Sequence, residues 1–328
     1  MDLSISDLFM EEWCPEDKKT TLDNMMEKGL IASSCMCPEC GSAMKIQASQ
    51  RSLDGFSWEC GGYTLVRRPK QKPKRVRCRK SVTVRRNSFF SQAHLSFRQI
   101  LIFSWWYCRN LPLTEGGLAA KFSLTSVTDW TSFCNEVILN YVYHSNTAIG
   151  GPGKEVEIDE SLFGKRKNHV GRVVEGQWVF GGVERGTGRC FLVPVAKRDR
   201  ETLFNHLREF VLPGTHVFSD CWRAYATIFP ELGLRHSTVN HSENFINPAT
   251  GAHTQTIESL WGRAKKSLPA GRRQSKHFTT ALAKFKFFNK IKRNRGDPFA
   301  AFLEAVKVVY DPGVAAQLVF DHEIDADD

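Results

Sequence analysis

The stretch Glu157-Ile158-Asp159-Glu160 decides how this chain is interpreted, because it places a carboxylate at the end of a short apolar run. A second apolar run, 217–218, ends at Asp220, and Glu258 opens a segment with helical spacing. Carboxylates at strand ends can converge on one point, where they repel each other unless divalent cations neutralise them. The three carboxylates are therefore candidate ligands of a two-metal site for phosphodiester chemistry.

A single aspartate after a strand has a simpler explanation. Such a residue often only forms a turn or caps a helix, and Asp220 stands directly before Cys221-Trp222-Arg223-Ala224-Tyr225, a segment that it could cap. The metal hypothesis therefore rests on the three carboxylates together, in the order strand, strand, helix.

Length and charge narrow the class of protein. At 328 residues the chain has room for two or three domains, and no window reaches the roughly 18 consecutive apolar residues of a membrane span. We expect no membrane partner and, since the N-terminus lacks the features of a signal peptide, an intracellular protein.

Positive charge is concentrated in two parts of the chain. The net charge is +10, although both ends are acidic. Residues 67–86 hold eleven Lys and Arg and no acid, and a second basic stretch spans 263–295. Such clusters suit a polyphosphate partner, the alternative being solvated loops.

Cysteine spacing predicts a metal site near the N-terminus. After an acidic leader, 1–34, residues 35–90 are expected to form a zinc ribbon with a basic insertion. Cys37-Pro38-Glu39-Cys40-Gly41 is a CxxC knuckle in which the glycine permits a tight turn. Cys60 and Cys78 complete the ligand set for one structural Zn²⁺, and Cys35 is a spare thiol. Four buried, unligated cysteines are the alternative.

Residues 91–149 change to helical periodicity and predict a helix-turn-helix-like DNA-binding module. An apolar helix is broken at Leu111-Pro112-Leu113-Thr114 and followed by a short helix and a longer one. Residues 123–125 would form the turn, and Ser126 with Asp129 would cap the longer helix. Generic helical packing is the alternative.

After the linker Gly150-Gly151-Pro152-Gly153, residues 154–295 change to strand periodicity. The expected order is three strands, a helix, a strand, a helix, a strand and a closing helix. This is the order of an RNase H-like α/β domain with a mixed sheet and flanking helices, and ligands gather at strand ends in such sheets. A C-terminal helix and acidic tail, 296–328, would follow. The expected strands are 156–158, 178–183, 190–195, 217–218 and 237–239, with an amphipathic helix over 200–211.

Longer motifs in this segment carry a family resemblance. They are Glu157-Ile158-Asp159-Glu160-Ser161, Gln177-Trp178-Val179-Phe180-Gly181-Gly182-Val183-Glu184-Arg185, Leu212-Pro213-Gly214-Thr215, Ser219-Asp220-Cys221-Trp222-Arg223-Ala224-Tyr225, Val239-Asn240-His241-Ser242 and His253-Thr254-Gln255-Thr256-Ile257-Glu258-Ser259-Leu260-Trp261. In this order they resemble the DDE transposases of the Merlin superfamily and their bacterial insertion-sequence relatives. The cysteine ribbon and Ser88-Phe89-Phe90 extend the resemblance over about residues 35–295. It implies cut-and-paste DNA transposition, with Asp159, Asp220 and Glu258 as ligands of two Mg²⁺ or Mn²⁺ ions.

Residues around these motifs sharpen the hypothesis. Lys265 stands seven residues after Glu258, about two helical turns, so both lie on nearly the same helix face. We expect Lys265 to contact a phosphate at the metals, the alternative being a surface lysine. His241 and His253 would lie near the scissile phosphate or form structural hydrogen bonds. The chain departs from the family pattern at Lys284-Phe285-Lys286-Phe287-Phe288-Asn289-Lys290, where the family tends to carry an acidic residue and a Trp-Arg pair.

Together these patterns predict a transposase that binds the terminal repeats of double-stranded DNA, cleaves them and joins them to target DNA, as a homo-oligomer on DNA. We expect it in the nucleus of a eukaryotic host or in the cytoplasm and nucleoid of a bacterium. The alternatives are a domesticated DNA-binding protein that has lost catalysis, and a nuclease or resolvase without strand transfer. The residues expected to contact DNA are Arg67, Arg68, Lys70, Lys72, Lys74, Arg75, Arg77, Lys265 and Lys266.

Overall fold

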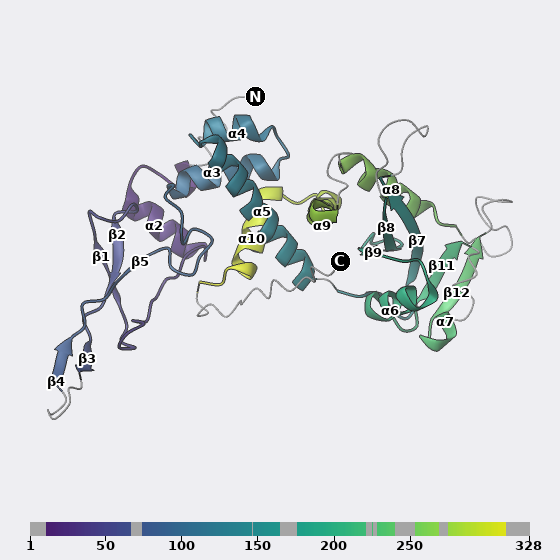
Figure 1. Cartoon of the computed structure of the whole chain (residues 1–328), viewed down its shortest axis with the longest axis horizontal. Helices are drawn as coiled ribbons and strands as arrows, with labels where there is room; N and C mark the ends of the chain where they lie inside the picture. Colours follow the sequence, from purple (N-terminus) through teal and green to yellow (C-terminus); the bar gives the residue numbers. More distant parts are fainter. Residues whose placement is uncertain are drawn as a thin grey trace. The chain divides into compact units, whose positions relative to one another are not determined.

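The computed structural model describes residues 11–66, 74–145, 147–164, 176–220, 225, 228–239, 253–268 and 275–312 (Figure 1). The chain divides into two compact units. Unit 1 comprises Met1–Val137 and Asp297–Asp328, and unit 2 comprises Ile138–Gly296. Within the described ranges, no helix has both the length and the apolar content needed to cross a membrane.

Unit 1 begins with helix α2 (Lys18–Glu27) and a small antiparallel sheet of β1 (Lys45–Ala48), β2 (Phe56–Glu59) and β5 (Ser81–Thr83). Strands β3 (Tyr63–Val66) and β4 (Lys74–Arg77) form a separate antiparallel pair. These paired strands belong to the basic insertion that the sequence predicted within the ribbon. The β-branched Thr64 pairs directly with the β-branched Val76, and residues of this type favour strands.

The helical part of unit 1 contains α3 (Phe97–Cys108), α4 (Leu113–Ala119), α5 (Leu124–His144) and α10 (Pro298–Val309). The boundary between the units falls within α5. A short helix, a turn and a longer helix occur in the predicted order, but the longer helix begins two residues earlier than expected. Ser123 precedes it, and its Oγ accepts from the backbone N–H of Ser126 at 3.1 Å. The predicted cap at Ser126 is therefore wrong; Ser123 performs that role.

An aromatic cluster fills the core of unit 1. Phe89 packs edge-to-face against Phe90, Trp130 and Phe302, with ring centroids 5.4, 5.3 and 6.1 Å apart. These rings come from the segment after the ribbon, from α5 and from α10, so their burial ties three distant parts of the sequence together. Beside them, Arg85 and Asp54 form a buried ion pair in which Arg85 Nε donates at 2.6 Å.

Unit 2 is built on a five-stranded mixed sheet of order β12-β11-β7-β8-β9. Strands β7, β8 and β9 pair antiparallel, and β11 and β12 join β7 in parallel. The order of these strands and helices along the chain is the one predicted from the sequence for an RNase H-like domain. The strands are β7 (Glu155–Phe163), β8 (Gln177–Glu184), β9 (Cys190–Val195), β11 (His216–Asp220) and β12 (Arg235–Val239).

Helices cover both faces of this sheet. Helix α6 (Arg200–Phe210) packs on the face that carries Val156 and Ile158 of β7, and the short α7 (Ile228–Glu231) joins the same core. Helices α8 (Gln255–Ser267) and α9 (Ser275–Arg293) pack on the opposite face. Strands β6 (Ile149–Gly150) and β10 (Val211–Leu212) form a separate parallel pair. Because side chains alternate along a strand, Asp159 lies on the α8 face and Glu160 on the α6 face.

Candidate active site and metal centre

Strand register brings the first two carboxylates to one level of the sheet. The last paired residues of β7 and β11 are Glu157 and Phe218, an offset of 61 positions. Continuing that offset sets Asp220 opposite Asp159, since 220 − 61 = 159, two residues beyond the last pair. Both aspartates thus lie where the two parallel strands cease to pair, which is the edge at which ligands bind in such sheets.

Helix α8 brings Glu258 to the same edge. Trp261, one turn after Glu258, donates from its indole Nε1 to Asp159 Oδ2 at 3.0 Å. The ring fits because the residue paired with Asp159 is Gly181, where a Cβ would lie 2.6 Å from Trp261 Cη2. Thr254 holds the third carboxylate by donating from Oγ1 to Glu258 Oε1 at 3.1 Å. A glycine in the central sheet therefore allows the helix that carries Glu258 to approach Asp159.

A fourth carboxylate, which sequence reasoning missed, docks this helix. Glu157 is fully buried and replaces the N-cap side chain that α8 lacks. Its Oε2 accepts from the backbone N–H groups of Thr256 and Ile257 at 2.8 and 3.0 Å, which are two of the donors left unpaired at a helix start. Arg185 donates from Nε to Glu157 Oε1 at 2.7 Å and from Nη2 to the carbonyl of His253 at 2.7 Å.

This arrangement has a structural consequence. Glu157 stands two residues before Asp159 on β7 and contacts the two helix residues directly before Glu258, so one buried side chain fixes the separation of two predicted ligands. The signal in the sequence was the acidic pair flanking Ile158 in Glu157-Ile158-Asp159, since a charged residue facing the core of a strand needs a partner.

The environment of Asp159 disfavours its charged form. Burial, together with smaller contributions from the charges of Asp220 and Glu258, raises the pKa of Asp159 to about 6, against the hydrogen bond from Trp261. Such mutual repulsion is what a bound cation would relieve, and carboxylate oxygens are the ligands that Mg²⁺ and Mn²⁺ prefer. The donor types therefore suit a divalent metal ion, while the ligand atoms of the three carboxylates do not all lie within 4.8 Å of one another.

The neighbouring Glu160 forms a second polar contact on the other face of β7. The hydroxyl of Tyr225 donates to Glu160 Oε1, and burial raises the pKa of Glu160 to about 7, with further contributions from Asp159 and Asp220. Only the structure reveals this contact, because the two residues are 65 positions apart in the sequence and no local pattern links them.

The remaining predicted residues of this site are two lysines and two histidines. Lys265 is exposed on α8, with its Nζ 5.5 Å from the centre of the Phe163 ring, and Lys266 beside it is also exposed. His253 Nδ1 lies 3.3 Å from Glu157 Oε1, which supports a structural role at the start of α8. His241 lies outside the described residues.

The four predicted zinc ligands come together in unit 1. The sulfur atoms of Cys37, Cys40, Cys60 and Cys78 all lie within 4.8 Å of one another. Sγ of Cys37 is 3.7 Å from that of Cys78, and Sγ of Cys40 is 3.4 Å from that of Cys60. Four sulfurs at 2.3 Å from a tetrahedral zinc ion would be separated by about 3.8 Å, so the cluster fits this metal. Among the described residues, no carboxylate or histidine group is gathered this closely.

Two glycines shape the cysteine cluster. Gly41 has φ of +70°, which turns the chain after the CxxC knuckle, and its N–H donates to the carbonyl of Cys37 at 2.9 Å. At Gly62, a Cβ would lie 2.3 Å from Ser42 Oγ and 3.0 Å from Cys40 Sγ, so any other residue would crowd the ligands.

The basic segment divides into exposed and buried residues. Lys74, Arg75 and Arg77 are exposed on β4, and the guanidinium of Arg75 stacks 4.3 Å from the ring of Tyr63. Arg85, part of the same basic run, is buried against Asp54 and is unavailable to DNA, which corrects the expectation for residues 67–86 as a whole. The other residues of the predicted DNA-binding set in this run, Arg67, Arg68, Lys70 and Lys72, lie outside the described residues.

Comparisons with known proteins bear on unit 2. Residues 149–288 match the family model of the ISXO2-like transposase domain. No curated protein sequence matches the chain. The structure of the HTLV-2 integrase catalytic core domain in complex with magnesium is 17% identical, with a TM-score of 0.29 over 42% of this chain and 84% of that one. The catalytic core domain of BIV integrase is 16% identical, with a TM-score of 0.29 over 48% of this chain and 97% of that one.

The family match falls on the segment in which the site was found. Residues 149–288 contain Asp159, Asp220 and Glu258 together with Glu157 and Trp261. The match supports an insertion-sequence type of DDE transposase for this part of the chain.

Proposed function

We propose that the protein is a DNA transposase that cleaves the ends of a mobile element and joins them to target DNA, within the Merlin superfamily of DDE transposases. The observation that carries this proposal is the shared level of Asp159 and Asp220 at the ends of two parallel strands, with α8 and Glu258 docked beside them. The transposase-domain match over residues 149–288 supports it.

Asp159, Asp220 and Glu258 would hold two Mg²⁺ or Mn²⁺ ions, with Asp159 shared between them. When bound, such ions activate a water or a 3′ hydroxyl and stabilise the leaving oxygen of a phosphodiester. The chain itself contributes orientation: Trp261 fixes one oxygen of Asp159, Thr254 fixes one oxygen of Glu258, and Glu157 sets the distance between the two elements. Lys265, exposed on the same helix, would contact a phosphate of the DNA.

Unit 1 would recognise the DNA ends. One Zn²⁺ bound by the four cysteines would stabilise the ribbon, the helices α4 and α5 would act as a helix-turn-helix-like module, and Lys74, Arg75 and Arg77 would contact phosphates. The partners are then terminal inverted repeats and target DNA, bound by a homo-oligomer, in the nucleus of a eukaryotic host or the nucleoid of a bacterium.

A strand-transfer assay tests this function. Purified protein is incubated with a duplex that carries the inverted repeat flanking its gene, with a target plasmid, and with Mg²⁺ or Mn²⁺. Cleavage followed by joining is the expected result. Cleavage without joining would identify a nuclease or resolvase, and specific binding without cleavage would identify a domesticated DNA-binding protein; either result would overturn the proposal.

A further inference from the structure

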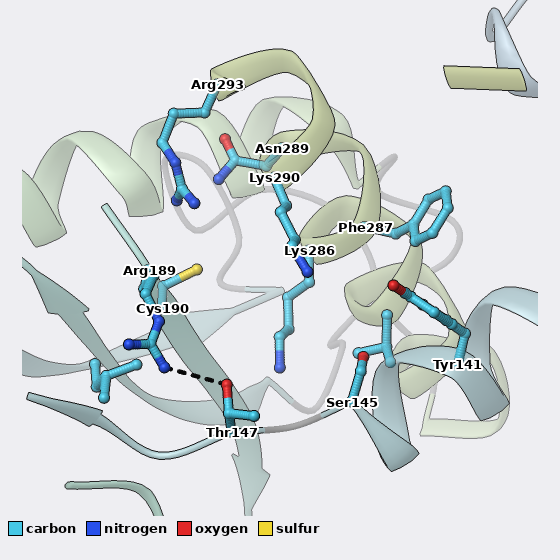
Figure 2. Close-up of a pocket in the computed structure, with 12 residues that line it drawn as sticks. Tyr141, Ser145, Thr147, Arg189, Cys190, Lys286, Phe287, Asn289, Lys290 and Arg293 are labelled. Atoms are coloured by element: carbon cyan, nitrogen blue, oxygen red, sulfur yellow. Dashed lines mark hydrogen bonds between the residues drawn. The ribbon is translucent and has the colours of Figure 1, made fainter. Parts of the chain in front are cut away.

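A basic pocket lies on the α8 and α9 face of unit 2, away from the carboxylates (Figure 2). It is a cavity of about 100 Å³ between the end of α5, the start of β9 and helix α9. Four cationic side chains line it, and its lining contains no acid. Those cations are Arg189, Lys286, Lys290 and Arg293.

The two guanidinium groups are held in place by neutral oxygen atoms. Arg189 Nη2 donates to the carbonyl of Ala148 at 2.8 Å and to Thr147 Oγ1 at 3.2 Å, the contact drawn in Figure 2. Arg293 Nη1 donates to the carbonyl of Gly188. Arg189 also forms an ion pair with the buried carboxylate of Glu184, whose Oε2 lies 3.8 Å from Nη1. These groups are therefore positioned before any ligand arrives, which lowers the entropy cost of binding an anion.

Three of the four cations form a row on one face of α9. Lys286, Lys290 and Arg293 are spaced by four and three residues, so they lie above one another along the helix. Like charges at this spacing destabilise a helix, and cations in the last turn are favoured only by the helix dipole. Lys286 lies two turns before the end of the helix and is half-buried, where the dipole gives little compensation.

The field inside the pocket is positive. Burial raises the pKa of the Cys190 thiol, while Lys286, Arg293 and Arg263 act in the opposite direction by favouring its anionic form. Burial also lowers the pKa of Lys286, and the charge of Lys290 lowers it further. A group of cations that disfavour one another around a small cavity is stabilised by an anion.

We propose that this pocket binds one phosphate group of a DNA backbone, as a subsite separate from the carboxylates. The cavity has the volume of roughly three water molecules, which is enough for a phosphate group. Such a contact carries no sequence information and positions the duplex. This inference rests on the proposed function for the identity of the DNA.

Sheet register relates the pocket to the carboxylates. One row of paired residues across β7, β8 and β9 is Glu157, Val183 and Cys190. The row two residues further along β7 is Asp159, Gly181 and Leu192. Cys190 is thus two residues along the strands and two strands across from Asp159, on the same face of the sheet, a separation of about 12 Å. A duplex cut at the carboxylates would present a nearby phosphate to the pocket.

The test is the salt dependence of DNA binding by the full-length protein, measured by fluorescence anisotropy with a terminal-repeat duplex and with an unrelated one. Lys290→Gln and the double variant with Arg293→Gln should weaken binding to both duplexes and reduce the slope of log K against log salt by about 1. Lys292→Gln is the matched control, because it removes the same charge from the same last turn of α9 outside the pocket lining. Its slope should equal that of the wild type.

Equal slopes for Lys290→Gln, the double variant and Lys292→Gln would overturn the proposal. A second arm uses inorganic phosphate in thermal-shift measurements at constant ionic strength. Stabilisation by phosphate that requires Lys290, combined with an unchanged DNA slope, would assign the pocket to a free phosphate compound and overturn the DNA assignment. Because both arms measure binding alone, an inactive protein would count against the proposed function and leave this result intact.

Discussion

The cysteine cluster of unit 1 and the carboxylate site of unit 2 are two predicted metal centres with opposite construction. The cysteines come from loops, and their sulfur atoms lie within 4.8 Å of one another. The carboxylates come from two strands and a helix; burial, with smaller contributions from the charges of Asp220 and Glu258, raises the pKa of Asp159. The cysteine site therefore forms by local turns around the ligands, whereas the carboxylate site is held by contacts behind the ligands, above all those of Glu157. We therefore expect substitution of a coordinating residue to unfold the cysteine site, and to inactivate the carboxylate site without unfolding it.

The largest expected effect is on chemistry. Asp159→Asn, Asp220→Asn or Glu258→Gln removes a charge that the cations require while barely changing volume. Each variant should fold and bind terminal-repeat DNA, but cleavage should fall by about 1000-fold or more, as positioning and charge stabilisation are lost. End-cleavage rates in Mg²⁺ and Mn²⁺ provide the measurement.

Glu201→Gln, on the exposed surface of α6, is the control for these variants and should cleave like the wild type. Near wild-type cutting by one of the three carboxylate variants would remove that residue from the metal site.

The next effect concerns the ribbon. Cys37→Ser should abolish binding of about one zinc ion per chain and unfold the segment around β1, β2 and β5, because a structural zinc site contributes folding energy directly. Metal analysis and hydrogen exchange over residues 35–84 provide the measurements. Cys35→Ser is the matched control, since Cys35 stands two residues away and outside the four-sulfur cluster. Zinc-free protein with an unaltered ribbon would contradict the comparison.

A smaller effect should follow from loosening the support of the carboxylate site. Glu157→Gln weakens the cap of α8 and its ion pair with Arg185, so Glu258 should be held less firmly relative to Asp159. The Mg²⁺ concentration for half-maximal cleavage should rise by about 10- to 100-fold, the usual cost of losing a group that orients metal ligands.

Glu155→Gln controls for the ion pair in that experiment. Glu155 lies on the same strand and accepts from Arg185 Nη1 at 3.1 Å, yet its side chain is exposed. An equal shift in metal dependence for both variants would show that Glu157 acts through Arg185 and general stability, not through the position of α8.

The smallest expected effect is on how the folding stability of unit 2 depends on pH. His236 lies on β12, stacks on Phe229 with ring centroids 3.9 Å apart, and contacts Ser219 Oγ through Nε2 at 2.8 Å. Burial lowers its pKa to about 4, from 6.5, and the charge of His216 contributes. Between these values the folded protein binds fewer protons than the unfolded chain. The contribution of neutral His236 to folding stability is therefore fully present above pH 6.5 and is lost as the pH falls toward 4.

Thermal unfolding between pH 7 and pH 4.5 checks this point. The melting temperature of the wild type should fall on acidification, and that of His236→Gln should fall less. His144→Gln, at the exposed end of α5, should retain the wild-type dependence. If the melting temperatures of all three proteins changed equally with pH, protonation of His236 would not be what destabilises unit 2 in acid.

Much of the framework follows from the sequence alone. Short apolar runs separated by turn residues predicted the five strands of unit 2, since strands covered by helices on both faces are apolar along most of their length. The CxxC spacing with Cys60 and Cys78 predicted a cluster that the structure contains, because a knuckle brings its two sulfurs together locally. Helix starts were less certain: Ser123 and Ser126 are both capping residues, and only packing selects between them.

Other features were decided by the tertiary structure. The cap of α8 by Glu157 joins residues about 100 positions apart, and Gly181 matters only because Trp261 lies over it; no local pattern encodes either contact. The pocket cations come from a turn and a helix separated by about 100 residues, and Arg85 is withdrawn from the basic run by an aspartate 31 positions away. Sequence determines which residues are acidic, basic or apolar and with what period, because those properties act locally. Which charges meet depends on strand register and helix docking, which are set by burial of the whole core.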